Sequence, residues 1–144
     1  MKASDFFSKE EKKQIITAIK EAEHQTSGEV RVHVELSCKV DVLDRAAYIF
    51  AKLKMHKTKL RNGVLIYLAV NDRKFAIIGD AGINKVVPAN FWNDIKEFMY
   101  DHFQKGDFVK GISKGIVMVG EHLKKFFPHQ KDDVNELSDE ISFN

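Results

Sequence analysis

Four acidic side chains stand where chain turns are expected, and their types and spacing suit the binding of a metal ion. They are Asp41, Asp44, Asp72 and Asp107. Carboxylate oxygens are the ligands that hard divalent cations prefer in proteins. If these side chains meet, they repel one another unless a cation lies among them. The sequence therefore predicts a weak divalent-cation site, with Ca²⁺ or Mg²⁺ as the cofactor.

Each of these acids also has a local explanation, and the sequence leaves both explanations open. Asp41 and Asp107 are good N-cap residues for helices that begin just after them. Asp44 falls in a first helical turn, where the helix dipole favours a negative charge. Asp72 is an ordinary turn residue. A second candidate site, Asp80 with Asn62, is expected at the opposite edge of the sheet.

Two predicted strands bring Asp41, Asp44 and Asp72 to one edge of a sheet, and we expect the helix after Asn90 to return Asp107 to the same edge. Residues 30–36 alternate apolar and polar side chains, which predicts a strand with one polar face. The continuous apolar run 64–70 predicts a central strand that is buried on both faces. A helix expected from Asp41 onward connects the strands and makes them parallel. Their carboxyl ends then share the edge at which open α/β sheets usually bind ligands.

The remaining periodicity completes the predicted fold. Ser8 and Glu11 form a capping-box pattern at the start of a first helix. The turn at Asn71-Asp72 and the apolar residues 75–78 predict a hairpin. Helical spacing returns in the residues after Asn90 and again after Asp107. The order helix, strand, helix, strand, strand, helix, helix predicts an α/β fold, a three-layer α/β/α sandwich with a small mixed β-sheet.

Other motifs predict no catalytic residue. Gly111-Ile-Ser-Lys-Gly115 matches the pattern around a hydrolase serine, but that pattern needs a sharp turn from a strand into a helix. Here it lies inside a helical repeat, so we expect the two glycines to let the helix approach the sheet closely. No histidine is fixed beside Cys38, which favours a small unreactive thiol. The histidines show no spacing typical of a helical zinc site.

Charge and hydropathy define the organisation of the chain. Lys and Arg total 23 against 21 Asp and Glu, a balance that argues against a dedicated nucleic-acid binder. Residues 128–144 carry five acids and one base, a net charge of −4, so residues 1–127 carry +6 of the total of +2. We expect a domain at 1–127 and a flexible acidic tail at 128–144, of which at most the last few residues dock.

The apolar runs are short, and this bears on location. The longest, residues 64–70, is well below the roughly 20 residues that a membrane helix needs. The N-terminus becomes charged too early for a signal peptide. We therefore expect a soluble, cytoplasmic monomer without a membrane segment.

The central hairpin resembles a known family, the TPM domain. The resemblance rests on Asn62-Gly-Val-Leu-Ile-Tyr-Leu-Ala-Val-Asn-Asp-Arg73, on Gly82-Ile83, and on Gly106-Asp-Phe108 followed by Gly111. It spans roughly residues 8–127. The first glycine of the family's Gly-x-Gly is Asp80 here. Many relatives carry a signal peptide and a C-terminal membrane helix, and this sequence shows neither pattern.

The resemblance implies an α/β/α sandwich and extends the functional expectation. Some TPM domains are reported to bind Ca²⁺ or related ions, and Asp44, Asp72 and Asp107 match acidic positions of the family pattern. Acid phosphatase activity has been proposed for some members. The leading hypothesis is a cation-binding accessory module that engages an unknown protein partner. The alternative is a weak metal-assisted phosphomonoesterase, in which Arg73 pairs with phosphoryl oxygens. A plain scaffold domain without a ligand is the third possibility.

Overall fold

A four-stranded mixed sheet forms the middle layer of the molecule. The computed structural model describes residues 1–131 and 134–144. The strand order is β3-β2-β1-β4. Strand β1 pairs in parallel with β2 and β4, whereas β2 and β3 are antiparallel. The strands are β1 (Glu29–Glu35), β2 (Gly63–Ala69), β3 (Lys74–Gly79) and β4 (Ser142–Phe143).

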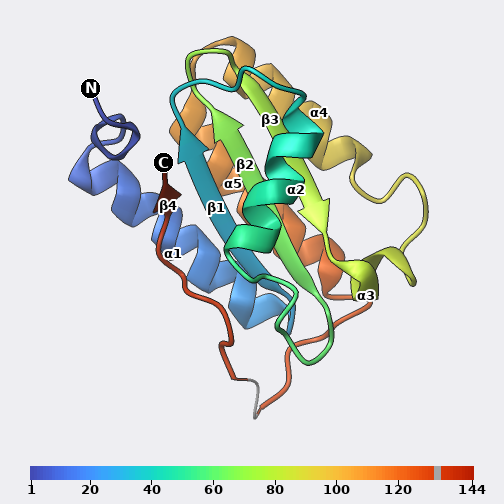
Figure 1. Ribbon diagram of the computed structural model, residues 1–144. Helices are drawn as coiled ribbons and strands as arrows, with labels where there is room; N and C mark the ends of the chain where they lie inside the picture. Colours follow the sequence, from blue (N-terminus) through green and yellow to red (C-terminus); the bar gives the residue numbers. More distant parts are fainter. Residues whose placement is uncertain (132–133) are drawn as a thin grey trace.

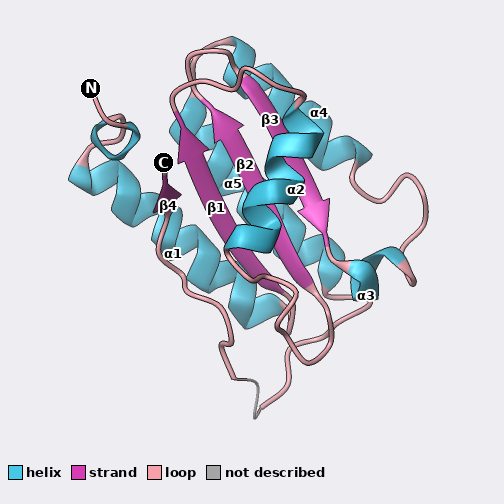
Figure 2. Cartoon of the chain, viewed as in Figure 1, coloured by secondary structure: helices cyan, strands magenta, loops and turns pink. Residues whose placement is uncertain are grey.

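Helices cover both faces of this sheet and make a three-layer α/β/α sandwich (Figures 1 and 2). Helices α1, α4 and α5 pack on one face, and α2 lies alone on the other. Their bounds are α1 (Lys9–Gln25), α2 (Val42–Lys52), α4 (Asn93–Gln104) and α5 (Phe108–Leu123). A 3₁₀ helix (Ala3–Asp5) and the one-turn α3 (Ala81–Asn84) complete the order. The predicted fold class is confirmed.

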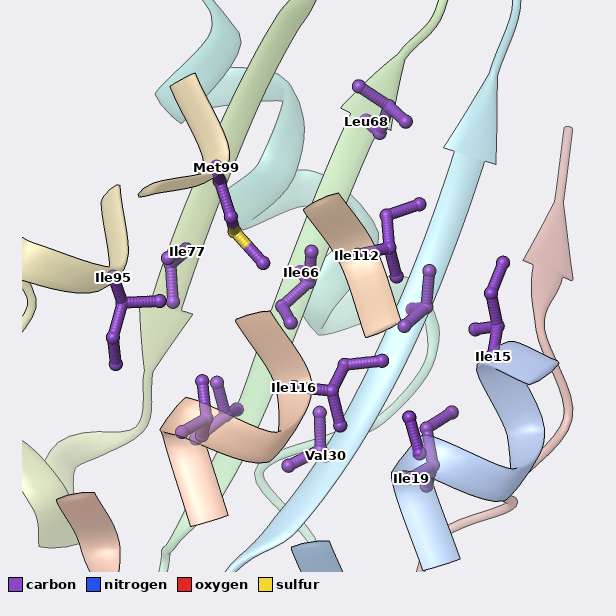
Figure 3. Packing of buried hydrophobic residues seen from close by; sticks show 14 of the residues in the cluster. Ile15, Ile19, Val30, Ile66, Leu68, Ile77, Ile95, Met99, Ile112 and Ile116 are labelled. Atoms are coloured by element: carbon purple, nitrogen blue, oxygen red, sulfur yellow. The ribbon is translucent and has the colours of Figure 1, made fainter. Parts of the chain in front are cut away.

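The larger core lies between the sheet and the three-helix layer (Figure 3). Alternate residues of β1 and β2 face it, as the period of a strand requires. The side chains labelled in the figure come from both layers and are buried: Ile15, Ile19, Val30, Ile66, Leu68, Ile77, Ile95, Met99, Ile112 and Ile116. A smaller core under α2 includes Ala46, Ile49, Leu65 and Tyr67.

Local signals in the sequence account for several element boundaries. The Ser8 hydroxyl accepts the Glu11 amide at 3.1 Å, and the Glu11 carboxylate accepts the Ser8 amide at 2.8 Å. These two bonds satisfy free donors at the start of α1. Asp41 accepts the amides of Leu43 and Asp44 at the start of α2. All seven residues of β2 are buried, as predicted for the central strand.

Two details differ from the sequence-based expectations. Most of the polar face of β1 is itself buried, because α2 and the C-terminal segment lie over it; Glu29, His33 and Glu35 are each less than 5% exposed, and Arg31 is half-buried. The glycines of α5 face another helix rather than the sheet. A Cβ added at Gly111 would meet Phe103, and one at Gly115 would meet Met99, both on α4.

The C-terminal segment returns to the body beside β1 (Figure 1). Pro128 forms an isolated bridge with Thr26, Leu137 is buried in the smaller core, and β4 adds a short parallel strand. Two acids of the predicted tail, residues 132 and 133, lie outside the described residues. The flexibility of the tail stays a prediction, but described contacts with the body occur at Pro128 and His129 and again at Glu136.

Candidate functional site

Three loops meet at the carboxyl edge of the parallel strands, as the sequence predicts. They follow β1, follow β2 and precede α5, and all lie at the upper end of the molecule in Figure 1. Asp72 Oδ2 accepts the amide of Cys38 at 2.7 Å and so joins the first two loops. Arg73 Nη1 donates to the carbonyl of Gln104 at 2.5 Å and joins the turn to the end of α4. Protein groups therefore hold this edge together.

The four predicted ligands have separate roles at this edge. Asp41 caps α2, and Asp44 lies in the first turn of that helix. Asp107 occupies the N-cap position of α5, but its side chain makes no capping hydrogen bond. Among residues 1–131 and 134–144, no group of three or more His, Cys, Asp or Glu side chains is arranged to hold a metal ion. A cation site made of Asp41, Asp44, Asp72 and Asp107 stays a prediction.

The second predicted pair has a structural explanation in its contacts. Asp80 is 6% exposed and accepts two hydrogen bonds from Arg61, at 2.8 and 2.9 Å, and one from the Ala81 amide. Burial alone would raise the pKa of Asp80, but the bonds from Arg61 and Ala81 outweigh it and lower the pKa. Asn62 is buried; its backbone amide donates to the Thr58 hydroxyl at 3.3 Å, whereas its side-chain nitrogen has no hydrogen-bond partner among the described residues. Asp80 thus joins the loop at Arg61 to α3.

An acidic corner that no sequence pattern predicted lies at the opposite edge of the sheet and is made by Glu23, Glu29 and Asp139. Glu29 Oε1 accepts the amides of Glu136 and Leu137 at 2.5 and 2.7 Å. Glu23, near the end of α1, shares a side-chain hydrogen bond with Asp139. Two carboxyl groups can bond in this way only when one of them holds a proton. The corner therefore joins α1, β1 and the C-terminal segment.

Burial and crowding strongly disfavour negative charge in the acidic corner. Burial, reinforced by the bond to Asp139 and its charge, raises the pKa of Glu23 to about 9. Burial also raises the pKa of Glu29 to about 7, although the amides of Leu137 and Glu136 oppose this change. The buried Oε2 of Glu23 has no hydrogen-bond partner among the described residues. Carboxyl groups perturbed in this way mark a candidate binding site.

A hollow of about 250 Å³ opens beside these carboxyl groups. Thr26, Ser27 and Gly28, which connect α1 to β1, line it together with His24 and His129. The two imidazole rings stack with their centroids 6.3 Å apart. Carboxylate and imidazole groups around one hollow are the donors that divalent metal ions use in proteins. One signal in the sequence could have indicated this pair: Glu23 and Glu29 lie on either side of a short turn between a helix and a strand.

A second buried polar cluster lies beneath α2 and β4. Its central group is Glu35, which accepts hydrogen bonds from Arg45, from the Tyr67 hydroxyl and, at 3.1 Å, from the side-chain amide of Asn144. His33 Nε2 lies 3.1 Å from the same carboxylate. Burial would raise the pKa of Glu35, but these bonds, led by Arg45, hold it at about 2. The carboxylate is thus fully engaged within the protein and has a structural role.

The comparisons with known proteins agree with this fold. A family model for the TPM domain matches residues 1–122. The chain belongs to the TPM domain family. A search of curated proteins finds no match. Among solved structures, this TPM domain is similar to the BA42 protein of the psychrophilic bacterium Bizionia argentinensis, with 48% identity, 99% of each chain covered and a TM-score of 0.93.

Two more distant structures show the fold alone. The N-terminal domain of cg2496 from Corynebacterium glutamicum is 14% identical, with 81% of this chain and 73% of that chain covered and a TM-score of 0.65. The N-terminal domain of a protein from P. gingivalis is 18% identical, with 88% and 83% covered and a TM-score of 0.71. Within the described part of this TPM domain, no helix is long and apolar enough to cross a membrane.

Proposed function

We propose that this TPM domain is an accessory module that binds Ca²⁺ or Mg²⁺ weakly and presents a protein-interaction surface that depends on the ion. The observation that carries the proposal is that Glu23, Glu29 and Asp139 line one hollow of about 250 Å³. We therefore assign the proposed ion to the acidic corner; the site predicted from the sequence at Asp41, Asp44, Asp72 and Asp107 is the alternative that the titration below tests.

The physical argument concerns what holds the carboxyl groups together. Without an ion, the Glu23 carboxyl keeps its proton until about pH 9, because burial and the adjacent Asp139 disfavour a second negative charge there. A divalent cation could replace that proton and attract both carboxylates. The described residues supply fewer than three such ligands to any one point, so water would complete the coordination. We therefore expect a dissociation constant of about 10⁻⁴ to 10⁻³ M, in the range of weak Ca²⁺ modules.

An accessory role follows from where the corner lies. An ion there would attach the C-terminal segment to α1 and β1, and so change the surface that a protein partner meets. At the carboxyl edge, Asp72 and Arg73 are already used to hold loops together. The engagement of Arg73 weighs against the alternative phosphomonoesterase, in which that side chain would have to contact a phosphoryl group.

The test is a titration with Ca²⁺ and with Mg²⁺, followed by backbone amide shifts. We expect shifts in residues 23–29 and 135–139, and at least tenfold weaker binding in Glu23→Gln. Asp107→Asn removes one charge at the other edge and is the matched control, with binding unchanged. Shifts confined to Cys38, Asp72 and Asp107 would instead place the ion at the carboxyl edge. The absence of shifts at either edge would refute cation binding.

The enzymatic alternative needs a separate assay. Purified protein with an aryl phosphate and Mg²⁺ is expected to show only the uncatalysed rate. Turnover that survives repurification and disappears in Asp72→Asn would favour the phosphomonoesterase.

A further inference from the structure

The turn that connects α2 to β2 carries a dense positive charge. We call residues 52–61 the basic turn. Along the chain, no acidic residue occurs between Asp44 and Asp72. The basic turn holds five permanent cations: Lys52, Lys54, Lys57, Lys59 and Arg61. A concentration of like charge of this kind creates a field that attracts anions to one part of the surface.

The basic turn is a compact structure, not a loose loop. Met55 and Thr58 are buried and anchor it, being 0% and 6% exposed. Internal bonds run from the Lys57 amide to the Lys54 carbonyl at 3.1 Å, and from the Arg61 amide to the Thr58 carbonyl at 3.3 Å. With the anchors facing inward, the lysine side chains face solvent.

Two of the cations in this turn have a strained backbone conformation. Lys54 and Arg61 have φ values of 56° and 52°, in the left-handed region. A residue with a Cβ is disfavoured there, by about 1 kcal/mol or more, where glycine would fit freely. Strained positions of this kind concentrate at functional sites. Arg61 has a structural partner in Asp80, but Lys54 forms no ion pair with any described residue.

The other lysines of the turn are also available to a ligand. Lys52, Lys57 and Lys59 are exposed, and none forms an ion pair within the described residues. Leu60, among them, is 48% exposed. Leu60 and Val134, which is 76% exposed, line the same hollow. Cations around protruding aliphatic side chains are the combination that binds the interface of an anionic membrane.

We infer that the basic turn docks this TPM domain on an anionic membrane surface. The lysine ammonium groups contact lipid phosphates, and Leu60 enters the interface between headgroups and acyl chains. Nucleic acid fits the patch less well, because residues 52–61 contain no Phe, Tyr or Trp on which bases could stack. The Glu136 carboxylate, which accepts the Lys59 amide, lies beside the patch and opposes anions. Docking is therefore weak and sensitive to salt.

The experiment is co-sedimentation of the full chain with vesicles in the presence of a metal chelator, so that its outcome is independent of the proposed cation site. Phosphatidylcholine vesicles containing roughly a quarter phosphatidylglycerol are compared with pure phosphatidylcholine vesicles. We expect binding to the anionic vesicles alone, decreasing as salt is raised. Each neutralised lysine should weaken binding about fivefold.

Two double variants make the test specific to the turn. Lys57→Gln with Lys59→Gln should weaken binding about 25-fold. Lys110→Gln with Lys114→Gln on α5 makes the same change in net charge on exposed residues elsewhere, and should leave binding within about twofold of the unchanged chain. Amide spectra of both variants check that they fold.

Three results would overturn the inference. One is no binding to the anionic vesicles even at low salt. The second is equal weakening in the two double variants, which would mean attraction by overall charge. The third is binding to a single-stranded oligonucleotide or an acidic peptide, but not to vesicles, with the loss confined to the variant of the basic turn. A loss in Leu60→Ser, in contrast, would support insertion of that side chain.

Discussion

The hydroxyl of Ser142 lies 2.8 Å from Nδ1 of His33, although the two residues are 109 positions apart in the sequence. The other ring nitrogen of His33 contacts Glu35, which also accepts the side-chain amide of Asn144. The C-terminal strand therefore supplies partners for polar groups that β1 buries. Buried polar groups without partners are costly, so these contacts join the last residues energetically to the sheet.

A first prediction concerns Leu137, which is 9% exposed and packs in the smaller core. Leu137→Ala should lower the free energy of unfolding by about 2–3 kcal/mol, because it removes buried methyl groups and leaves a cavity. Val134→Ala is the matched control, since Val134 is 76% exposed; it should change stability by less than about 0.5 kcal/mol. Urea unfolding measures both.

Equal, small effects of the two substitutions would contradict packing of the segment against the body. They would favour the flexible tail predicted from the sequence, whose deletion (residues 129–144) would leave the melting temperature nearly unchanged. With Leu137 packed, the same deletion should lower the melting temperature by several degrees.

A second prediction concerns the stability of the fold in acid. Burial lowers the pKa of His33 below its usual 6.5, against the opposing effect of Glu35. The unfolded chain therefore takes up a proton at His33 that the folded protein resists. Stability linked to His33 is complete above about pH 6.5 and is lost as the pH falls below that value. Thermal unfolding between pH 8 and 5 should decline less steeply for His33→Gln than for the unchanged chain; parallel curves would contradict the assignment.

Protonation of Glu35 should lower the stability of the fold further, at lower pH. Its pKa is held at about 2, compared with 4.5 in the unfolded chain. Its contribution is therefore complete above about pH 4.5 and disappears as the pH falls toward 2. Because Arg45 is its leading partner, Arg45→Met should reduce the stability lost between these two values. Equal losses with and without Arg45 would argue against that pairing.

A third prediction concerns the alkaline side and the acidic corner. The raised pKa values of Glu23, about 9, and Glu29, about 7, mean that the fold retains protons that the unfolded chain has released. In a chelator, the stability linked to these groups is complete below about pH 4.5 and decreases as the pH rises through 7 and 9. Ca²⁺ should therefore raise the melting temperature more at pH 9 than at pH 6.

Glu23→Gln tests this slope directly, because its amide can donate to Asp139 as a protonated carboxyl does. The variant should lose most of the alkaline decline and most of the response to Ca²⁺. Glu21→Gln, an exposed change on the same helix, should keep both. A response to Ca²⁺ that is unchanged in Glu23→Gln would show that the ion lies elsewhere.

Local order in this protein could be predicted from the sequence, and long-range contacts of polar groups could not. The capping box at Ser8, the buried strand β2 and the parallel crossover depend on neighbouring residues or on simple periodicity. The three converging loops follow from that topology. The sequence predicts that their carboxylates need a cation. In the structure, Asp72 accepts the amide of Cys38, a contact that no sequence pattern predicts.

The acidic corner is a second case in which a contact between residues far apart in the sequence could not be predicted. Glu29 meets Leu137 across 108 positions of the sequence, and only the return of the C-terminal segment brings them together. The sequence predicts a flexible tail of which at most the last few residues dock, because charge alone cannot order it. Hydrogen bonds from two backbone amides to the buried Glu29 carboxylate, together with the burial of Leu137, stabilise the docked segment in addition to the attraction between charges.

A last prediction concerns the contact between α1 and α5. A Cβ added at Gly120 would lie 2.8 Å from Ala22 Cα and 3.1 Å from the Ala22 carbonyl oxygen, both backbone atoms of α1. Alanine favours a helix over glycine by about 1 kcal/mol, but overpacking against backbone costs about 1–3 kcal/mol. Gly120→Ala should therefore destabilise the fold. At Gly115 the added Cβ would meet the Met99 side chain, which can rotate away. Urea unfolding should show the larger loss for Gly120→Ala, and the reverse order would mean that α1 moves more easily than Met99 repacks.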